Sequence, residues 1–551
     1  MLKPSVMLRE TKRKLNGWNV ISGIGAIAAL FPSLYILAGL FRKPNENWAH
    51  ITTYLLADYA KQSLILVTFT VFFTVLIGSV LAWLVAAYDF PLRRFFAWGL
   101  ALPLSVPPYI AAYTYGSMFS YTGSVQLFIR NTLGMKIDQR YFDILSMKGA
   151  IFIFTLFLFP YVYLVTKSFL ERQSAAFIEN ARLLGKGPVS IFFRVILPLS
   201  QFAIVGGASL VAFEVLNDFG LTKHFGIESF TAAIFKTWFG MNDIDSANRL
   251  AAMLMSIMVL LFVTERLLRR RKRYSSQTGR SAPLQRRKLT GAGAWAAFII
   301  CMIVSLLSFV VPITQLLVWA SWTYDDVFNA AFWVLIRNTV SISTLAVLLL
   351  LTFACIAANA SRLDRSVVSL AMTKVIGMGY SVPGAVLSIG VLAVFIWLDE
   401  KLASVYIALG FAEGKLVLTM SLVMLVFAYI VRFAAVGFNA VETGFEKRGI
   451  RHAEASRMLG RGMTRTFFTV DLPMIKGAVL TGFLLAFMEI VKELPLTLLL
   501  RPFNFDTLAT KAYQYASDEQ IHQASVPALI LVAIGVVSVF IYHKIGESQS
   551  A

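Results

Sequence analysis

The stretch ENARLLGKGPVSIFFRVILP, residues 179–198, returns later in the chain as EASRMLGRGMTRTFFTVDLP, residues 454–473. At this shift of 275 positions, ten of the twenty residues are identical, whereas average amino-acid usage would give roughly one identity. SVPP at 105–108 returns in the same order as SVPG at 381–384. These matches indicate that the chain contains two copies of one unit in the same order.

The composition predicts a membrane protein. Of the 551 residues, 58% are hydrophobic and only 15% are charged, while soluble domains carry about 25% charged residues. Many apolar runs reach the ~20 residues that a helix needs to cross a bilayer. The net charge of +20 lies in short segments between these runs, which is typical of cytoplasmic loops and not of a nucleic-acid-binding face.

We predict an all-α polytopic protein with about twelve transmembrane helices, six in each copy. The first copy covers residues 1–268, a basic linker covers 269–290, and the second copy covers 291–551. An even number of spans gives both copies the same orientation, as in parallel repeats. The predicted spans cover residues 18–41, 62–88, 95–120, 149–170, 199–222, 248–268, 291–320, 337–360, 370–398, 415–441, 477–500 and 525–543.

Lysine and arginine set the predicted orientation. The N-terminal tail, the segments that contain the two matched stretches and the linker are basic and fall on one side, which is therefore predicted to be cytoplasmic together with both termini. Residues 265–289 hold ten Lys or Arg against one Glu and are predicted to be solvated. The first apolar run is too long for the hydrophobic region of a signal peptide, so we expect it to stay as a transmembrane helix.

Each matched stretch predicts a short helix on a long cytoplasmic loop. In the first copy we expect a helix over 181–184 that Gly185 and Gly187 break, followed by apolar residues that need a partner. Such a segment is suited to binding in a groove of another protein. An amphipathic helix on the lipid surface is the alternative, but two matched copies on one side favour a symmetric protein partner.

The two stretches, E-N-A…G…I-L-P and E-A-S…G…D-L-P, resemble the EAA loop of binding-protein-dependent ABC importer permeases. The resemblance implies the type I importer permease fold and a coupling helix that binds the ATPase subunit. Asn180 and Ser456 stand where this family usually has alanine. The docking residues that the resemblance implies are Glu179, Ala181, Gly185, Glu454, Ala455 and Gly460.

No G-x-x-x-x-G-K-[ST] phosphate-binding motif occurs in the sequence. The resemblance therefore implies a translocation subunit without catalytic residues or a bound cofactor, and ATP bound by two copies of a partner ATPase. It also implies a periplasmic solute-binding protein as a partner and a multi-pass location in the bacterial inner membrane. An enzyme is disfavoured because the five histidines are scattered, and both cysteines lie in apolar runs.

Four carboxylates are candidate residues of the substrate pathway, because intramembrane acids are costly and usually functional. Glu214 and Asp218 lie four residues apart in the fifth predicted span, and the shift of 275 pairs them with Glu489 and Glu493. We expect each pair on one helix face and all four near the outer mouth, where they would attract a cation. Alternatively they are paired or cap helix ends, with Lys492 in that network. No metal site is firmly assigned.

Four tyrosines cluster in the third predicted span, and two explanations were weighed for them. Phenol groups could bind ferric iron, but an aromatic belt at the membrane interface is the favoured prediction. The residues concerned are Tyr109, Tyr113, Tyr115 and Tyr121.

The segment 489–519 is similar to the C-terminal half of fused ferric-iron ABC permeases, notably in Glu-Leu-Pro and in Arg-Pro-Phe-Asn-Phe-Asp-Thr-Leu-Ala. This resemblance implies import of ferric iron by alternating access. Import of thiamine or another small solute stays open. A secondary transporter with two six-span repeats is a third hypothesis, and the matched loops argue against it.

Overall fold

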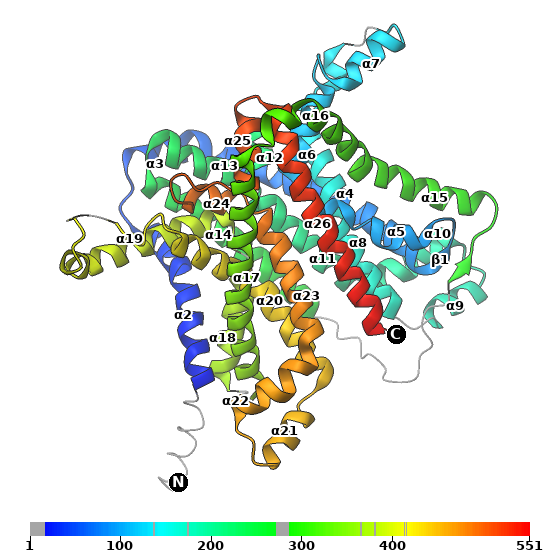
Figure 1. Cartoon of the computed structure of the whole chain (residues 1–551). Coiled ribbons are helices and arrows are strands. Elements are labelled where there is room, and N and C mark those ends of the chain that lie inside the picture. Colours follow the sequence, from blue (N-terminus) through cyan, green and yellow to red (C-terminus); the bar gives the residue numbers. More distant parts are fainter. Residues whose placement is uncertain are drawn as a thin grey trace. The chain divides into compact units, whose positions relative to one another are not determined.

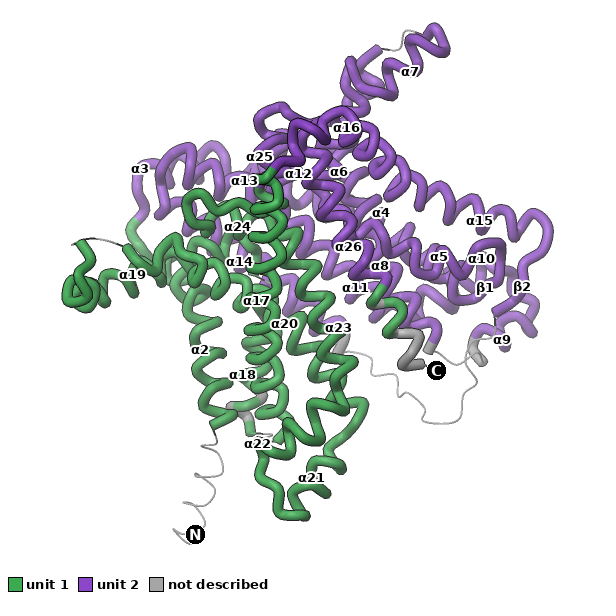
Figure 2. The backbone as a smooth tube through the Cα atoms, in the orientation of Figure 1, with its two compact units in different colours: residues 1–43, 330–510, 541–551 green, residues 44–329, 511–540 purple. Residues whose placement is uncertain are grey.

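The described part of the chain is almost entirely helical (Figure 1), because in hydrocarbon every backbone N–H and C=O must find a partner within the protein. The computed structural model describes residues 17–135, 138–172, 176–270, 286–363, 366–379, 382–412, 414 and 416–550. The basic N-terminal tail and residues 271–285 of the predicted linker lie outside the described residues. The chain divides into two units, unit 1 and unit 2 (Figure 2).

Unit 1 consists of residues 1–43, 330–510 and 541–551. Its elements are α2 (Gly17–Ala38), η1 (Gly39–Phe41), α17 (Ala330–Leu363), α18 (Val367–Met378), α19 (Gly384–Ala408), α20 (Leu422–Arg448), α21 (Arg451–Met458), α22 (Met463–Thr466), the π-helical turn η9 (Phe467–Asp471), α23 (Leu472–Val491) and α24 (Pro495–Leu500).

Unit 2 consists of residues 44–329 and 511–540. Up to the first matched loop, its elements are α3 (Glu46–His50), η2 (Ile51–Leu55), α4 (Leu56–Ala87), β1 (Tyr88–Asp89), α5 (Arg93–Gly99), η3 (Leu102–Ser105), α6 (Pro108–Phe119), α7 (Ser124–Thr132), η4 (Gln139–Phe142), α8 (Met147–Arg172), α9 (Ala176–Leu183), α10 (Pro188–Ile191) and the π-helical turn η5 (Phe192–Ile196).

The rest of unit 2 consists of α11 (Leu197–Asn217), α12 (Gly220–His224), α13 (Phe230–Phe235), η6 (Lys236–Gly240), α14 (Ile244–Arg270), β2 (Arg287–Lys288), α15 (Ala292–Ser305), η7 (Leu306–Val310) and α16 (Val311–Val327). Helix α25 (Leu508–Ser517) begins in unit 1 and ends in unit 2, and α26 (Ile521–Ser550) begins in unit 2 and ends in unit 1.

Ten helices among the described residues are long and apolar enough to cross a membrane, and a bent pair brings the number to as many as eleven. The bent pair joins Arg93–Ser105 to Pro108–Thr132 at 88°, in place of the straight span predicted over 95–120. Two consecutive prolines, Pro107 and Pro108, explain the bend, because neither can donate a backbone hydrogen bond. In the second copy, α18 and α19 occupy the predicted span 370–398, and residues 380–381 between them lie outside the described residues.

Each unit is built around three helices that correspond under the shift of 275. They are α4, α8 and α11 in unit 2, and α17, α20 and α23 in unit 1. In unit 2, glycines allow these helices to approach closely. A Cβ atom on Gly207 would lie 2.7 Å from the Cα of Val162, and one on Gly78 would lie 2.8 Å from the Cβ of Val162.

The units differ from the two sequence copies in their first helices. Helix α2, from the first copy, packs in unit 1, where a Cβ atom on Gly390 of α19 would lie 2.5 Å from the carbonyl oxygen of Pro32. Helices α15 and α16, from the second copy, belong to unit 2. There the rings of Phe96 and Phe298 lie 5.9 Å apart. Each copy therefore contributes its first span to the unit that holds the core of the other copy.

The C-terminal end of the predicted linker is ordered against unit 2. Strand β2 pairs in parallel with β1, and Arg286 lies 3.2 Å from Glu171 of α8. Arg286, Arg287 and Lys288 are nevertheless exposed, as expected for a solvated segment, although their backbone is ordered beside the end of α4. Helix α14 likewise continues to Arg270, into the start of the predicted linker.

The close approach at Gly207 gives a test of the unit 2 core. We expect Gly207→Val to lower the free energy of unfolding by about 1–3 kcal/mol, because the added methyl groups would overlap the backbone of α8. The measurement is thermal unfolding of the detergent-solubilised protein. Gly240→Val is the control, since a Cβ atom there meets nothing within 4 Å; equal melting temperatures for the two variants would contradict the packing described.

Candidate functional site

The two matched stretches have the same backbone structure. We call residues 176–196 the first loop and residues 451–471 the second loop. Every element of the first loop, α9, α10 and η5, corresponds at a shift of 275 to α21, α22 and η9 of the second loop. Each loop passes through its π-helical turn directly into a long helix, α11 or α23. A displacement of either loop is therefore passed along a continuous helix.

A left-handed glycine ends the short helix in each loop. Gly185 has φ +71° and Gly460 has φ +82°. The amide of Lys186 donates to the carbonyl of Ala181 at 3.1 Å, and the amide of Arg461 donates to that of Ser456 at 3.3 Å. This is the hydrogen-bond pattern of a glycine-terminated helix. Gly185 thus ends α9, which is longer than the predicted helix over 181–184.

The second glycine of each loop has a different role from the left-handed glycine that precedes it. Gly187 has φ −70° and Gly462 has φ −65°, and each immediately precedes the next short helix. A Cβ atom at any of these four glycines meets nothing within 4 Å. The two positions in a loop therefore differ in backbone conformation and not in the space around them.

Large apolar side chains are exposed at the end of each short helix. Leu183 and Leu184 are 84% and 77% exposed, and Met458 and Leu459 are 89% and 83% exposed. Neither pair is among the docking residues that the sequence implied. Their position just before the left-handed glycine is the signal that could have identified them, because apolar residues at a helix end often contact a partner.

The implied docking residues separate into exposed and buried positions. Glu179, Glu454 and Ala455 are exposed, as are Gly185 and Gly460. Ala181 is buried at 8% exposure and packs in the core cluster of unit 2 with Ile178 and Ile191. The exposed positions of each loop therefore form a surface with an acidic residue, an apolar pair and a glycine.

The carboxylates Asp218 and Glu493 lie beyond the ends of the long helices. Helix α11 ends at Asn217 and α23 ends at Val491, so neither predicted pair shares one helix face. Asp218 accepts a hydrogen bond from the amide of Leu221 at 2.9 Å, and Glu493 accepts one from the amide of Leu496 at 3.1 Å. Both side chains cap a short helix that follows the break, which was the alternative explanation considered for them.

The two acids of unit 1, Glu489 and Glu493, are each paired with a cation. Glu489 lies 2.8 Å from Lys492, and Glu493 lies 3.4 Å from Arg432. The Arg432 and Glu493 side chains are only 6% and 7% exposed. Glu214 is half-buried in α11 of unit 2. Because the four acids belong to two separate units, the predicted ring of carboxylates stays a prediction.

The tyrosines do not form the predicted aromatic belt. Tyr109, Tyr113 and Tyr115 are buried in unit 2, because α6 follows the 88° bend and packs among other helices. The hydroxyl of Tyr115 donates to the carbonyl of Leu307. Tyr121 is exposed, and the guanidinium of Arg130 lies 4.1 Å from its ring centre.

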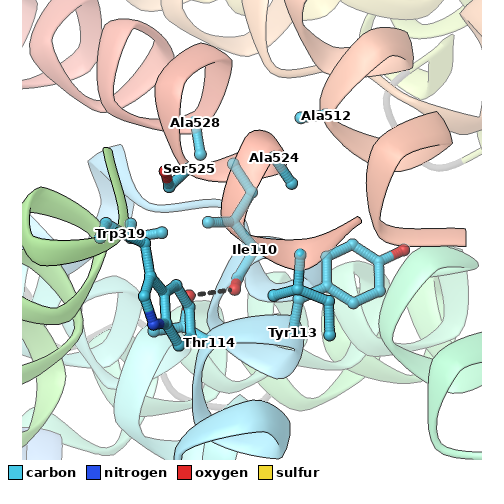
Figure 3. A pocket seen from close by; sticks show the side chains of 10 residues that line it. Ile110, Tyr113, Thr114, Trp319, Ala512, Ala524, Ser525 and Ala528 are labelled. Atoms are coloured by element: carbon cyan, nitrogen blue, oxygen red, sulfur yellow. Dashed lines mark hydrogen bonds between the residues drawn. The ribbon is translucent and has the colours of Figure 1, made fainter. Parts of the chain in front are cut away.

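A small pocket lies in unit 2 between α6, α16, α25 and α26 (Figure 3). Its walls include Tyr113, Trp319 and Ala528, and no acidic or basic residue lines it. The hydroxyl of Thr114 donates to the carbonyl of Ile110, so this polar group is already satisfied within α6. The pocket is apolar and lacks the charged groups that a cation site needs.

Metal-binding side chains do not cluster in the part of the chain that the structure describes. Within those residues, no group of three or more His, Cys, Asp or Glu could hold a metal ion. Cys301 and Cys355 are free thiols and are buried.

Comparisons with known proteins place these features in a family. The family model described as "Binding-protein-dependent transport system inner membrane component" matches residues 74–274 and 350–548. The two matches correspond to the two sequence copies, and each contains one of the loops.

Individual relatives differ in the solute that their names state. The chain is 26% identical to "Fe(3+)-transport system permease protein FbpB 2" of Haemophilus influenzae, over 89% of this chain and 90% of that protein. It is 24% identical to the sulfate transport system permease protein CysT of Salmonella typhimurium, over 38% of this chain and 76% of that protein. It is 27% identical to the molybdenum transport system permease protein ModB of Escherichia coli, over 28% of this chain and 65% of that protein.

The buried pair of Arg432 and Glu493 gives a prediction about stability. We expect Glu493→Gln to lower the free energy of unfolding by about 3–5 kcal/mol, because it leaves Arg432 as an uncompensated buried charge. Glu489→Gln is the matched control and should cost less, since Lys492 is 18% exposed and can reach water. Thermal unfolding in detergent measures both variants.

A second variant separates charge from packing. If Arg432→Met is added to Glu493→Gln, the buried charge is removed and much of the lost stability should return. A double variant as unstable as Glu493→Gln alone would show that the missing counter-charge is not the cause.

Proposed function

This chain belongs to the family of binding-protein-dependent transport system inner membrane components, and from that premise we propose that it is the translocation subunit of an ATP-driven importer of ferric iron. The observation that carries the iron assignment is the similarity to an Fe(3+)-transport permease over 89% of the chain. The sulfate and molybdenum permeases match only 38% and 28% of it. A periplasmic binding protein delivers the iron, and the subunit itself catalyses no reaction.

In this proposal, two copies of a separate ATPase subunit bind the first and second loops. The exposed pairs Leu183–Leu184 and Met458–Leu459 insert into a groove on each ATPase, as apolar anchors of short helices do. Closure of the ATPases on ATP displaces both loops. The displacement passes through the π-helical turns into α11 and α23, which supports alternation between inward-facing and outward-facing states.

The alternative cargo is an oxyanion, which the sulfate and molybdenum relatives favour. The acids of the predicted pathway do not decide between the cargoes, because Glu489 and Glu493 are paired with Lys492 and Arg432; the choice of iron rests on the similarity over 89% of the chain. Thiamine or another small solute stays a further alternative. All three cargoes use the same loops, so coupling to ATP and the identity of the solute are tested separately.

The left-handed glycines test the coupling role of the loops. The double variant Gly185→Val with Gly460→Val forces a β-branched residue to positive φ, where it is a conformational outlier, and should abolish solute uptake. The control is Gly187→Val with Gly462→Val, which adds the same side chains at ordinary φ and should retain uptake. Membrane vesicles that contain the whole importer provide the measurement, with bound ATPase quantified in parallel. Uptake by the first double variant with the ATPase still bound would refute the coupling role.

The acids test the pathway and the cargo. In proteoliposomes that contain the complete importer, radiolabelled ferric iron should accumulate, whereas sulfate, molybdate and thiamine should not. The combined variant Glu214→Gln with Glu489→Gln should reduce iron uptake, because it removes two negative charges from the predicted pathway. Unchanged uptake in the combined variant would assign both acids a structural role, and uptake of an oxyanion in place of iron would overturn the cargo.

A further inference from the structure

A buried ion pair connects the end of the second loop to the core helices of unit 1. A terminal guanidinium nitrogen of Arg362 lies 2.9 Å from Oδ1 of Asp471, and the two side chains are 12% and 7% exposed. The same guanidinium lies 4.4 Å from the ring centre of Phe445. Arg362 is near the end of α17, Phe445 is near the end of α20, and Asp471 immediately precedes α23. One side chain therefore joins the ends of the three core helices beside the second loop.

The three corresponding positions in unit 2 are apolar. At a shift of 275, Arg362 corresponds to Ala87, Phe445 to Leu170 and Asp471 to Ile196. Ala87, Leu170 and Ile196 are 0%, 0% and 1% exposed and belong to one hydrophobic cluster. The same three helix ends meet beside the first loop, but without any charge among these residues.

A second contact differs in the same way. In the second loop, the hydroxyls of Ser456 and Thr466 are hydrogen-bonded at 3.0 Å and join α21 to α22. The first loop has Ala181 and Ile191 at these positions, both buried. Two separate contacts thus use polar groups in the second loop where the first loop uses apolar packing.

These contacts respond differently to a force along the helices. Apolar burial has no preferred direction, so the contacts among Ala87, Leu170 and Ile196 do not by themselves impose one geometry on the helix ends beside the first loop. A buried ion pair has one favourable geometry, and separating its partners leaves an uncompensated charge. A displacement of the second loop must therefore carry the ends of α17 and α20 with it.

We propose that Arg362 and Asp471 are positioning residues that make the second loop the rigid one of the two, so that its displacement passes directly to α17 and α20. This inference rests on the proposed function, in which both loops bind an ATPase. It predicts that the two ATPase subunits are not equivalent in driving transport. Loss of the ion pair should uncouple ATP hydrolysis from import without preventing assembly.

The test replaces the ion pair with apolar residues, as in the first loop. In the complete importer reconstituted in proteoliposomes, Arg362→Met with Asp471→Ile is expected to fold, because apolar replacement of a buried ion pair is often neutral or stabilising. The readout is the number of ATP molecules hydrolysed per solute imported, which a change in the amount of assembled complex would not alter. We expect this ratio to rise about fivefold or more, the range of coupling between linked sites.

The matched control removes an ion pair near the first loop. Arg286 and Glu171 lie 3.2 Å apart, with side chains 43% and 34% exposed, and the double variant Arg286→Gln with Glu171→Gln should leave the ratio unchanged.

A ratio for the apolar double variant equal to that of the unmodified complex, with ATPase bound, would overturn the inference. If that variant does not assemble, Arg362→Lys replaces it and should raise the ratio, since lysine lacks the planar fork; no rise would again overturn the inference. Failure of the proposed function would look different, because the unmodified complex would then bind no ATPase or import no iron.

Discussion

The need to satisfy every backbone amide in a water-free environment constrains this protein more than any other requirement. Long helices meet it automatically, but α11 and α23 both end within an apolar region and each is followed by a short helix. At each break a carboxylate accepts the exposed amide, Asp218 from Leu221 and Glu493 from Leu496. The acids at these two positions are thus accounted for by the backbone. A role in binding the solute would have to be additional to this capping.

The two copies have the same backbone structure but differ in the side chains that join their helices. The loops, the π-helical turns and the capped breaks all recur at a shift of 275. The side chains at the helix junctions do not: Arg362 and Arg432 of unit 1 stand where unit 2 has Ala87 and Phe157. Buried ion pairs give fixed geometry at a cost in desolvation, whereas apolar contacts give stability without direction. The two copies are therefore alike in their backbone and different in the side chains at their helix junctions.

The sequence was sufficient for features that depend on local pattern. The repeat, the loops, the glycine that ends each short helix and most spans follow from identity, hydropathy and φ preference. The exchange of α2 between copies could not be predicted, because hydropathy identifies a span but not its neighbours, and the approach of Gly390 to Pro32 is a tertiary contact. Asp218 and Glu493 were assigned to helix faces because the spacing of four residues assumes an unbroken helix. Pro495, two residues after Glu493, was a signal of the break, because proline has no backbone N–H to continue the hydrogen bonds of a helix.

The two copies also differ in the charged side chains near the ends of α11 and α23. In unit 1, Glu489 is balanced by Lys492 and Glu493 by Arg432, so these four side chains contribute no net charge. The position of Lys492 is occupied by Asn217 in the first copy, and no cation stands at the position of Arg432 there. At these corresponding positions unit 1 therefore carries two cations, whereas the first copy has Asn217 and Phe157. Two identical subunits related by a two-fold axis could not differ in this way, because symmetry would repeat every charge. Fusing the two copies into one chain removes that restriction, so that corresponding positions of the two halves can carry different charges.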